Sequence, residues 1–271
     1  MSEWAEASRP PEPLQETPLN NLRDLAGIRV EGGVLAPHRV FRSDDVSTVP
    51  ADQASRLFDL GIRTVIDLRS RAESDHTGRG ALGRHEVRYV SLPLVGGAAD
   101  PEEFLRHLRE GTATPTTVGE YYAATAAAEA ETIARGLRVI TASDGATLFH
   151  CQAGKDRTGI FAGVLLGVLG ADPDDIAADY AASAEAVPRI MARVSASIGH
   201  LMGESDEYFR AAAAGLGPVS PLLGAEADAM HAMLDILDAR HGGARALLRS
   251  AGFDDAEREA LRVRVVAGPL L

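Results

Sequence analysis

Two reactive residue types are almost absent from this sequence. Its 271 residues include one cysteine, Cys151, and one lysine, Lys155, so 26 of the 27 basic residues are arginine. A single cysteine excludes an internal disulfide, and no group of cysteines and histidines has the spacing of a zinc site. We therefore expect a fold that is held by its hydrophobic core and that has neither a disulfide nor a zinc site.

Long apolar runs and excess positive charge are missing as well. No stretch of 18 or more apolar residues occurs, and the N-terminus lacks the pattern of a secretory signal. We expect no membrane span, and either a cytoplasmic location or export without a signal peptide. The net charge of −12 argues against nucleic-acid or anionic-membrane binding, because a polyanion needs a basic surface. An anionic ligand must therefore be held by a local basic site.

What the sequence does contain is a recurring order of strand, tight loop and helix. Residues 1–18 are rich in proline and glutamate and are expected to form a disordered tail. Residues 19–271 are expected to form a single domain, with helical additions after about residue 172. The pattern predicts an α/β fold with a central, mostly parallel sheet flanked by helices.

The expected elements follow from apolar spacing and from capping residues. Strands are expected at residues 39–45, 63–70, 85–94 and 145–151. Helices are expected at residues 51–61, from Asp100-Pro101, at 117–140 as one long helix, at 157–170, and almost continuously from Asp172-Pro173 to the end.

The stretch HCQAGKDRTG, residues 150–159, joins a buried strand to an apolar helix and holds both rare residues. A helix N-terminus has backbone N–H groups without partners and the positive end of the helix dipole, so it attracts anions. Cys151 and Arg157 have C-x5-R spacing, and the turn between them can wrap its amides around a phosphate-sized anion. Gly154 permits the tight curl.

The side chains of this loop suit phosphoryl chemistry. Arg157 can grip two oxygens with its planar guanidinium, and the same positive groups would stabilise Cys151 as a thiolate nucleophile. The hydroxyl of Thr158 is expected to donate to the sulfur and help it leave. Lys155 is expected to add a mobile positive charge at the rim. A lone cysteine at a strand end is commonly a core residue, but the extended motif between strand and helix indicates a catalytic loop.

The motif resembles the phosphate-binding loop of cysteine-dependent protein tyrosine phosphatases. Its GKDRTG form resembles the bacterial atypical branch of that family. The resemblance runs from about Asn20 to about Val266. It includes the segments NNLRDLAG, RVFRSDDV, GIRTVIDLRSRAES, DYAASAEAVPRIMARV and LLRSAGFDDAEREALR.

The resemblance implies a tyrosine phosphatase fold without metal or other cofactor, in which Cys151 is the nucleophile and Arg157 the phosphate clamp. It implies activity on phosphotyrosine and, as in several members, on phosphoserine, phosphothreonine and phosphoinositides. His150 would orient the loop, and Lys155 and Asp156 would shape specificity. The backbone would form the phosphate cradle at Gln152, Ala153, Gly154, Lys155, Asp156 and Arg157.

The residue that acts as the general acid is not assigned by the motif. A leaving phenolate or alkoxide takes its proton from a carboxylic acid on a separate loop. Within the resembling family, an Asp follows soon after a Leu-Pro stretch, but this sequence has Val95 and Gly96 there. Asp100 is better explained as a helix cap, so Asp156 is the preferred acid or water-positioning group. Without a strong acid, aryl phosphates would still be cleaved and alkyl phosphates poorly, because phenolate leaves readily.

Other polar candidates are expected to be structural. Asp44 and Asp67 lie at the ends of predicted strands and should accept hydrogen bonds. Arg42 and Arg69 should pair with carboxylates, namely Asp24, Asp67 or Glu73, although they could instead add positive field at the mouth of the site.

Two sets of apolar residues are left with a choice of roles. Tyr121 and Tyr122 should pack in a helix core, although one of them could stack on a substrate ring. Core and lid roles are equally compatible with the apolar face formed by Met191, Ile198, Leu201, Met202 and Phe209.

The leading hypothesis is a cysteine phosphatase that acts on phosphotyrosine proteins or phosphoinositides through a cysteinyl-phosphate intermediate. One alternative is a phosphatase of a small soluble phosphoester, such as an inositol phosphate or a nucleotide. Another is a phosphate-reading binding module with weak or no turnover. Redox chemistry such as arsenate reduction would need a partner's thiol, because Cys151 has no second cysteine to pair with. The oligomeric state is left open.

Overall fold

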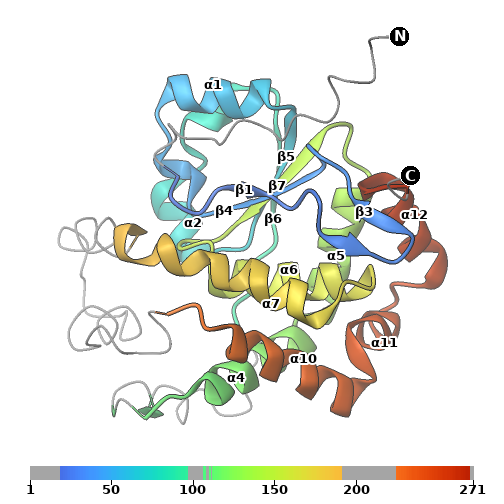
Figure 1. The fold of residues 1–271 in the computed structure, drawn as a ribbon. Helices are drawn as coiled ribbons and strands as arrows, with labels where there is room; N and C mark the ends of the chain where they lie inside the picture. The colour runs from blue at the N-terminus through green and yellow to red at the C-terminus, as the bar shows by residue number, and fades with distance from the viewer. Residues whose placement is uncertain (1–18, 97–105, 108–109, 111, 191–223, 269–271) are drawn as a thin grey trace.

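The computed structural model describes residues 19–96, 106–107, 110, 112–190 and 224–268 (Figure 1). The predicted tail, the Asp100-Pro101 helix start and the predicted lid residues all lie outside these ranges.

The centre of the fold is a five-stranded sheet in the order β1-β4-β7-β5-β6. β4 pairs with β7, β7 with β5 and β5 with β6 in parallel, and only the short β1 is antiparallel. The prediction of a mostly parallel sheet is therefore confirmed. The strands are β1 (Arg23–Asp24), β4 (Val40–Ser43), β5 (Ile62–Asp67), β6 (Arg88–Ser91) and β7 (Ala146–His150).

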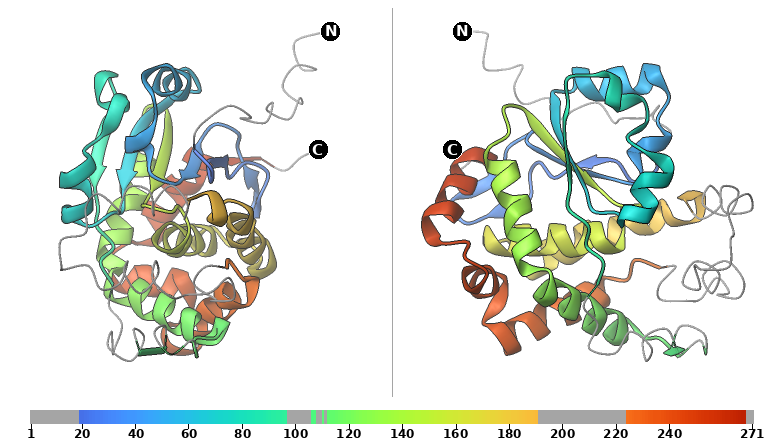
Figure 2. Two further views of the ribbon diagram at one scale, coloured as in Figure 1. Left: turned by 90° about the vertical axis from the view of Figure 1, so that its left-hand side faces the viewer. Right: turned by 180° about the vertical axis from the view of Figure 1, so that it is seen from behind.

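Helices cover both faces of this sheet (Figures 1 and 2). Consecutive residues of a strand point to opposite faces, so Leu148 joins the hydrophobic cluster on one face and Phe149 the cluster on the other. One face carries α1 (Ala51–Asp59), α2 (Arg71–Thr77) and the 3-10 helices η1 (Val46–Thr48) and η2 (Gly80–Arg84).

The other face carries the larger helical layer. In both views of Figure 2, α4 and α10 form an outer layer against α6 and α7. The elements are α4 (Pro115–Ala128), α5 (Ala130–Thr141), α6 (Asp156–Val168), α7 (Pro173–Ala181), η3 (Ala182–Glu185), α10 (Ala227–His241), α11 (Gly243–Ser250) and α12 (Asp255–Val265). No helix in the described ranges has both the length and the apolar character needed to cross a membrane.

The structure corrects two expectations about the elements. The single helix expected over residues 117–140 is two helices, α4 and α5, which meet at Glu129. α4 packs against α10, whereas α5 packs against α11 and α12, so the two helices have different packing partners. The chain also does not stay helical to its end, because β8 (Val266–Ala267) pairs with β3 (Gly33–Leu35), beside β2 (Arg29–Val30), in a second small sheet.

Candidate active site

The predicted catalytic loop lies at the carboxyl edge of the central sheet. Cys151 directly follows β7, which runs between β4 and β5, and α6 begins at Asp156. The side chain of Cys151 is buried, and its thiol is free. Because ligands of open α/β sheets bind at the carboxyl ends of the strands, the loop has the expected position for a site.

The loop turns its carbonyl groups outward. The side-chain amide of Asn21 donates to the carbonyl oxygens of Ala153 (3.2 Å) and Gly154 (2.9 Å), and Arg42 also donates to that of Gly154 (2.9 Å). In a planar trans peptide the N–H points opposite to the C=O. The N–H groups of Gly154 and Lys155 therefore face the inner side of the loop, as an anion cradle requires. The carbonyl of Gln152 also points outward, since it accepts a hydrogen bond from the backbone amide of Asp45 at 3.2 Å.

An ion-pair cluster holds Arg42 behind the loop. Asp179 of α7 accepts from Arg42 in a short contact and from Arg23 at 2.8 Å. Burial alone would raise the pKa of Asp179, but the two guanidinium groups lower it. Burial and the neighbouring charge of Arg42 lower the pKa of Arg23 to about 10. Arg42 is therefore paired, but with Asp179 instead of the partners expected from the sequence.

Gly154 is required by its backbone and by its surroundings. Its φ is +67°, in the left-handed region. A Cβ there would lie 2.5 Å from the carbonyl oxygen of Ser43 and 2.6 Å from the amide nitrogen of Asp44. The loop thus rests directly on the end of β4. Asp44 itself accepts from the amides of Asn20 and Asn21, which is the structural role predicted for it.

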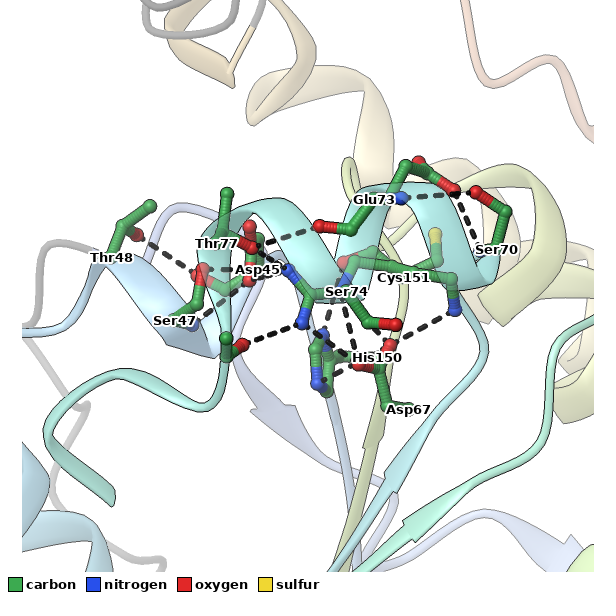
Figure 3. A network of polar contacts seen from close by, with 12 residues as sticks. Asp45, Ser47, Thr48, Asp67, Ser70, Glu73, Ser74, Thr77, His150 and Cys151 are labelled. Atoms are coloured by element: carbon green, nitrogen blue, oxygen red, sulfur yellow. Dashed lines mark hydrogen bonds and ion pairs between the residues drawn. The ribbon is translucent and has the colours of Figure 1, made fainter. Parts of the chain in front are cut away.

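Arg157 forms a two-pronged ion pair with Glu73 of α2. Its two terminal nitrogens lie 2.6 and 2.8 Å from the two carboxylate oxygens. Glu73 also closes the capping box of α2, because one of its oxygens accepts from the amide of Ser70 at 2.7 Å (Figure 3). Burial would raise the pKa of Glu73, but Arg157 and the Ser70 bonds lower it. The guanidinium plane is therefore fixed before a phosphate arrives.

A second buried cluster supports the strand that leads into the loop (Figure 3). Arg69 is fully buried and pairs with Asp67 (2.8 Å) and Asp45 (2.9 Å), so its pairing with Asp67 is as predicted. His150 lies next to this cluster, with Nε2 3.9 Å from Asp67. Burial lowers the pKa of His150 and keeps its ring neutral. Its Nδ1 is 3.1 Å from the carbonyl oxygen of Cys151, which only accepts, so the buried hydrogen bond expected of His150 is present.

Lys155 does not act as a mobile charge at the rim, and that expectation is wrong. The residue is 2% exposed, and its ammonium lies 2.9 Å from Asp156 and bonds the hydroxyl of Tyr180. Tyr122 also donates to Asp156, so its hydroxyl does more than the expected core packing. Burial would raise the pKa of Asp156, but Lys155 and Tyr122 lower it. An ionised carboxylate fits water positioning and does not fit a resting general acid.

The remaining predicted residues have mixed outcomes. Thr158 is buried, and its hydroxyl has no hydrogen-bond partner among the described residues, so the expected bond to the sulfur of Cys151 is not formed here. Asp100 lies in residues 97–105, outside the part of the chain that the structure describes. Within that part, no group of three or more histidine, cysteine, aspartate or glutamate side chains is arranged to hold a metal.

The roles observed for four supporting residues were not predicted from the sequence, namely those of Asn21, Arg23, Glu73 and Asp179. All four lie in the segments that carried the family resemblance, and each is polar in a mostly buried setting. Each makes a bond that links the loop, or its immediate support, to an element distant in sequence. Their polar character inside segments that resemble the family was the available signal.

Comparison with known proteins agrees with this geometry. A family model described as "Tyrosine phosphatase family" matches residues 14–267. A protein of Cupriavidus necator with the provisional name tyrosine-protein phosphatase is 31% identical over 239 residues, which cover 86% of this chain and 81% of that protein. A tyrosine-protein phosphatase of Nostoc commune is 30% identical, over 83% of this chain and 73% of that protein.

A third relative is the triple specificity protein phosphatase PtpB of Mycobacterium tuberculosis. It is 27% identical over 266 residues, which cover 89% of this chain and 95% of that protein. The match to the family model spans the sheet, the Cys151 loop and the supporting elements described above. The chain therefore belongs to the tyrosine phosphatase family, whose members are phosphoric monoester hydrolases.

Proposed function

We propose that this protein is a cysteine-dependent phosphatase that hydrolyses phosphotyrosine in proteins through a cysteinyl-phosphate intermediate. The observation that carries the proposal is the outward binding of the loop carbonyls by Asn21 and Arg42, which leaves the loop N–H groups directed inward. Fixed donors of this kind stabilise the charge on a phosphoryl group in transfer without reorganisation. Cys151 begins the same loop, and Arg157 adds a pre-oriented guanidinium.

The reaction would proceed in two displacements. In the first, the thiolate of Cys151 attacks phosphorus, an S–P bond forms, and the bond to the tyrosine oxygen breaks. In the second, a water oxygen attacks the same phosphorus, the S–P bond breaks, and inorganic phosphate and the thiolate are released. The loop amides and Arg157 would hold the equatorial oxygens in both steps.

The charge state of Asp156 bears on which esters are cleaved. Lys155 and Tyr122 favour its ionised form, so Asp156 does not supply a proton to the leaving group in the first step. We expect the rate to depend strongly on the leaving group, with aryl phosphates cleaved faster than alkyl phosphates. Phosphate release from a series of esters with graded leaving-group pKa tests this, and equal rates on aryl and alkyl esters would contradict it.

Activity on substrates other than phosphotyrosine is suggested by a relative. PtpB of Mycobacterium tuberculosis, which carries the name triple specificity phosphatase, is similar over nearly the whole chain. Activity on phosphoserine, phosphothreonine or phosphoinositides is therefore worth direct comparison. However, the buried and paired Lys155 offers no mobile cation to a multiply phosphorylated ring. We therefore favour phosphotyrosine as the substrate.

The test measures phosphate release from a phosphotyrosine peptide and from phosphatidylinositol monophosphates side by side. Cys151→Ser is the control for contaminating activity. We expect the wild type to turn over the peptide preferentially and the variant to turn over neither. Binding of both substrates without turnover by the wild type would refute the proposed phosphatase activity and favour a phosphate-reading binding module.

A further inference from the structure

A closed group of four polar side chains lies beside the loop and has no part in the phosphate cradle. It joins Tyr122 of α4 and Tyr180 of α7 to Lys155 and Asp156. The tyrosines are 0% and 1% exposed and the lysine 2%. The hydroxyl of Tyr122 donates to Asp156 Oδ1 and lies 2.8 Å from that of Tyr180, and Lys155 Nζ lies 2.9 Å from the same Oδ1.

The donors of this group can be assigned in one consistent direction. Each phenol has a single proton, and an ammonium only donates. Because Tyr122 donates to Asp156, it accepts from Tyr180. The oxygen of Tyr180 then accepts from Lys155, with which it is hydrogen-bonded. The chain of donors therefore runs from Lys155 through both tyrosines to the carboxylate.

The carboxylate of Asp156 is held by one of its two oxygens. Both donors bind Oδ1, and no described residue donates to Oδ2. The Asp156 side chain is 25% exposed, whereas the other three members are buried. Oδ2 is thus the acceptor of the network that is left to water.

Stability alone does not explain why these four polar side chains are buried together. Burying an ion pair costs desolvation free energy, and apolar side chains of the same volume are commonly as stable. Gly159 of α6 leaves room for the ring of Tyr180, because a Cβ on Gly159 would lie 2.8 Å from that ring. The two tyrosine rings meet edge to face, with centroids 5.8 Å apart. Ring packing and hydrogen bonds together fix where Asp156 lies.

We propose that Tyr122 and Tyr180 are positioning residues for the hydrolysis of the cysteinyl phosphate, which hold Asp156 by Oδ1 so that Oδ2 accepts a proton from the attacking water. This proposal rests on the proposed function. As the water oxygen bonds to phosphorus and the S–P bond breaks, the proton passes to Oδ2. The thiolate of Cys151 is restored, and Asp156 later returns the proton to solvent. Asp156 is the catalytic base, and the tyrosines act through it.

The surroundings of Asp156 set the direction of its pH dependence. Lys155, Tyr122 and Arg157 lower its pKa against the effect of burial. Burial and the charge of Asp156 both raise the pKa values of the nearby Tyr121 and Tyr180. Burial and the nearby carboxylate raise the pKa of Tyr122, so its proton stays in place. A base must be ionised to work, so activity through Asp156 is lost as pH falls through its pKa. Removing a donor raises that pKa and moves the loss to higher pH.

The test uses Tyr122→Phe and Tyr180→Phe, which keep the rings and remove one hydroxyl each. Tyr121→Phe is the matched control, because Tyr121 is on the same helix and its hydroxyl bonds Thr125. A pre-steady-state experiment with an aryl phosphate separates the burst, which reports S–P bond formation, from the steady rate, which reports hydrolysis. General bases contribute about 10²–10⁴-fold, so a misplaced base should slow the steady rate about tenfold or more in Tyr122→Phe.

We expect the burst rate to stay unchanged, the effect of Tyr180→Phe to be smaller than that of Tyr122→Phe, and Tyr121→Phe to match the wild type. We also expect the acid limb of kcat to move to higher pH in Tyr122→Phe. Equal slowing of burst and steady rate without a shift of that limb would overturn the proposal and leave a packing role. Wild-type kinetics in both variants would overturn it too. Absence of turnover in the wild type would instead refute the proposed function.

Discussion

At the residue scale, Glu73 serves two structural purposes through one carboxylate. It completes the capping box of α2 and orients Arg157 with two hydrogen bonds. We predict that Glu73→Gln lowers kcat/KM about 10- to 100-fold, because hydrogen bonds between charged groups contribute about 1.5–3 kcal/mol. Steady-state kinetics on an aryl phosphate measures this.

Glu257 provides a matched control for that prediction. It closes the capping box of α12 and pairs with Arg138 through both oxygens, at 2.6 and 3.0 Å. It therefore has the same local geometry as Glu73 on an element away from the loop. Glu257→Gln should change thermal stability to a similar or smaller extent and leave kcat/KM unchanged. Equal activity of the two variants would show that Arg157 needs no carboxylate to orient it.

Single residues were predictable where the chemistry is local. The C-x5-R spacing and the helix start placed Cys151 and Arg157 in one loop between a buried strand and a helix, and the tight turn required Gly154, and the structure shows both features. Partners could not be predicted when they come from distant elements, as Glu73 and Asp179 do. Lys155 was misjudged for the same reason, because the tyrosines that bury it lie on α4 and α7.

At the element scale, the loop keeps its shape because it rests on the end of β4. We predict that Gly154→Ala destabilises the protein by at least about 3 kcal/mol and abolishes activity, because backbone strain and steric overlap add. The new Cβ would meet backbone atoms of Ser43 and Asp44, which cannot move aside without shifting β4. Urea unfolding and phosphate release measure the two effects.

Gly27→Ala separates strain from overlap in that experiment. Gly27 has a φ of +83°, similar to that of Gly154, but no atom would lie within 4 Å of its Cβ. It should cost only the left-handed strain of about 1–2 kcal/mol and retain activity. If both variants lose the same stability and both keep activity, the close packing of the loop on β4 is not what preserves the site.

The elements themselves were largely predictable from periodicity and caps. The buried strands and α6 lie close to their predicted ranges, because apolar runs next to turn residues give clear signals. The break at Glu129 was missed because the alanine-rich sequence there contains no glycine or proline. β8 was missed because two residues are too few to show alternation, and their pairing depends on β3.

At the scale of the whole molecule, stability should fall as the solution becomes acidic. Burial lowers the pKa of His150 below its usual 6.5, so the unfolded chain binds a proton that the folded protein does not. Stability is therefore lost as pH falls from 6.5 through the folded pKa, with a slope of up to about 1.4 kcal/mol per pH unit for one proton. Urea unfolding at several pH values in this window measures the slope.

The carboxylates extend this loss at lower pH. The pKa values of Asp67, Glu73, Asp156 and Asp179 are all lowered in the folded protein despite burial, because each is paired with a cation. The stability that they contribute is present above their unfolded values and is lost below about pH 4.5. His150→Gln should remove the slope that begins near pH 6.5 and keep the loss below about pH 4.5. A wild-type curve that is flat from pH 6.5 down to that point would contradict a neutral, buried His150.

The central claim is that Cys151 carries the phosphoryl group between the two displacements. The most direct measurement is rapid acid quenching of the wild type with a radiolabelled phosphotyrosine peptide, followed by digestion and location of the labelled residue. The account predicts transient label on Cys151 that forms in the first turnover and decays as inorganic phosphate appears. Sustained phosphate release with no covalent label, or with label on another residue, would contradict it.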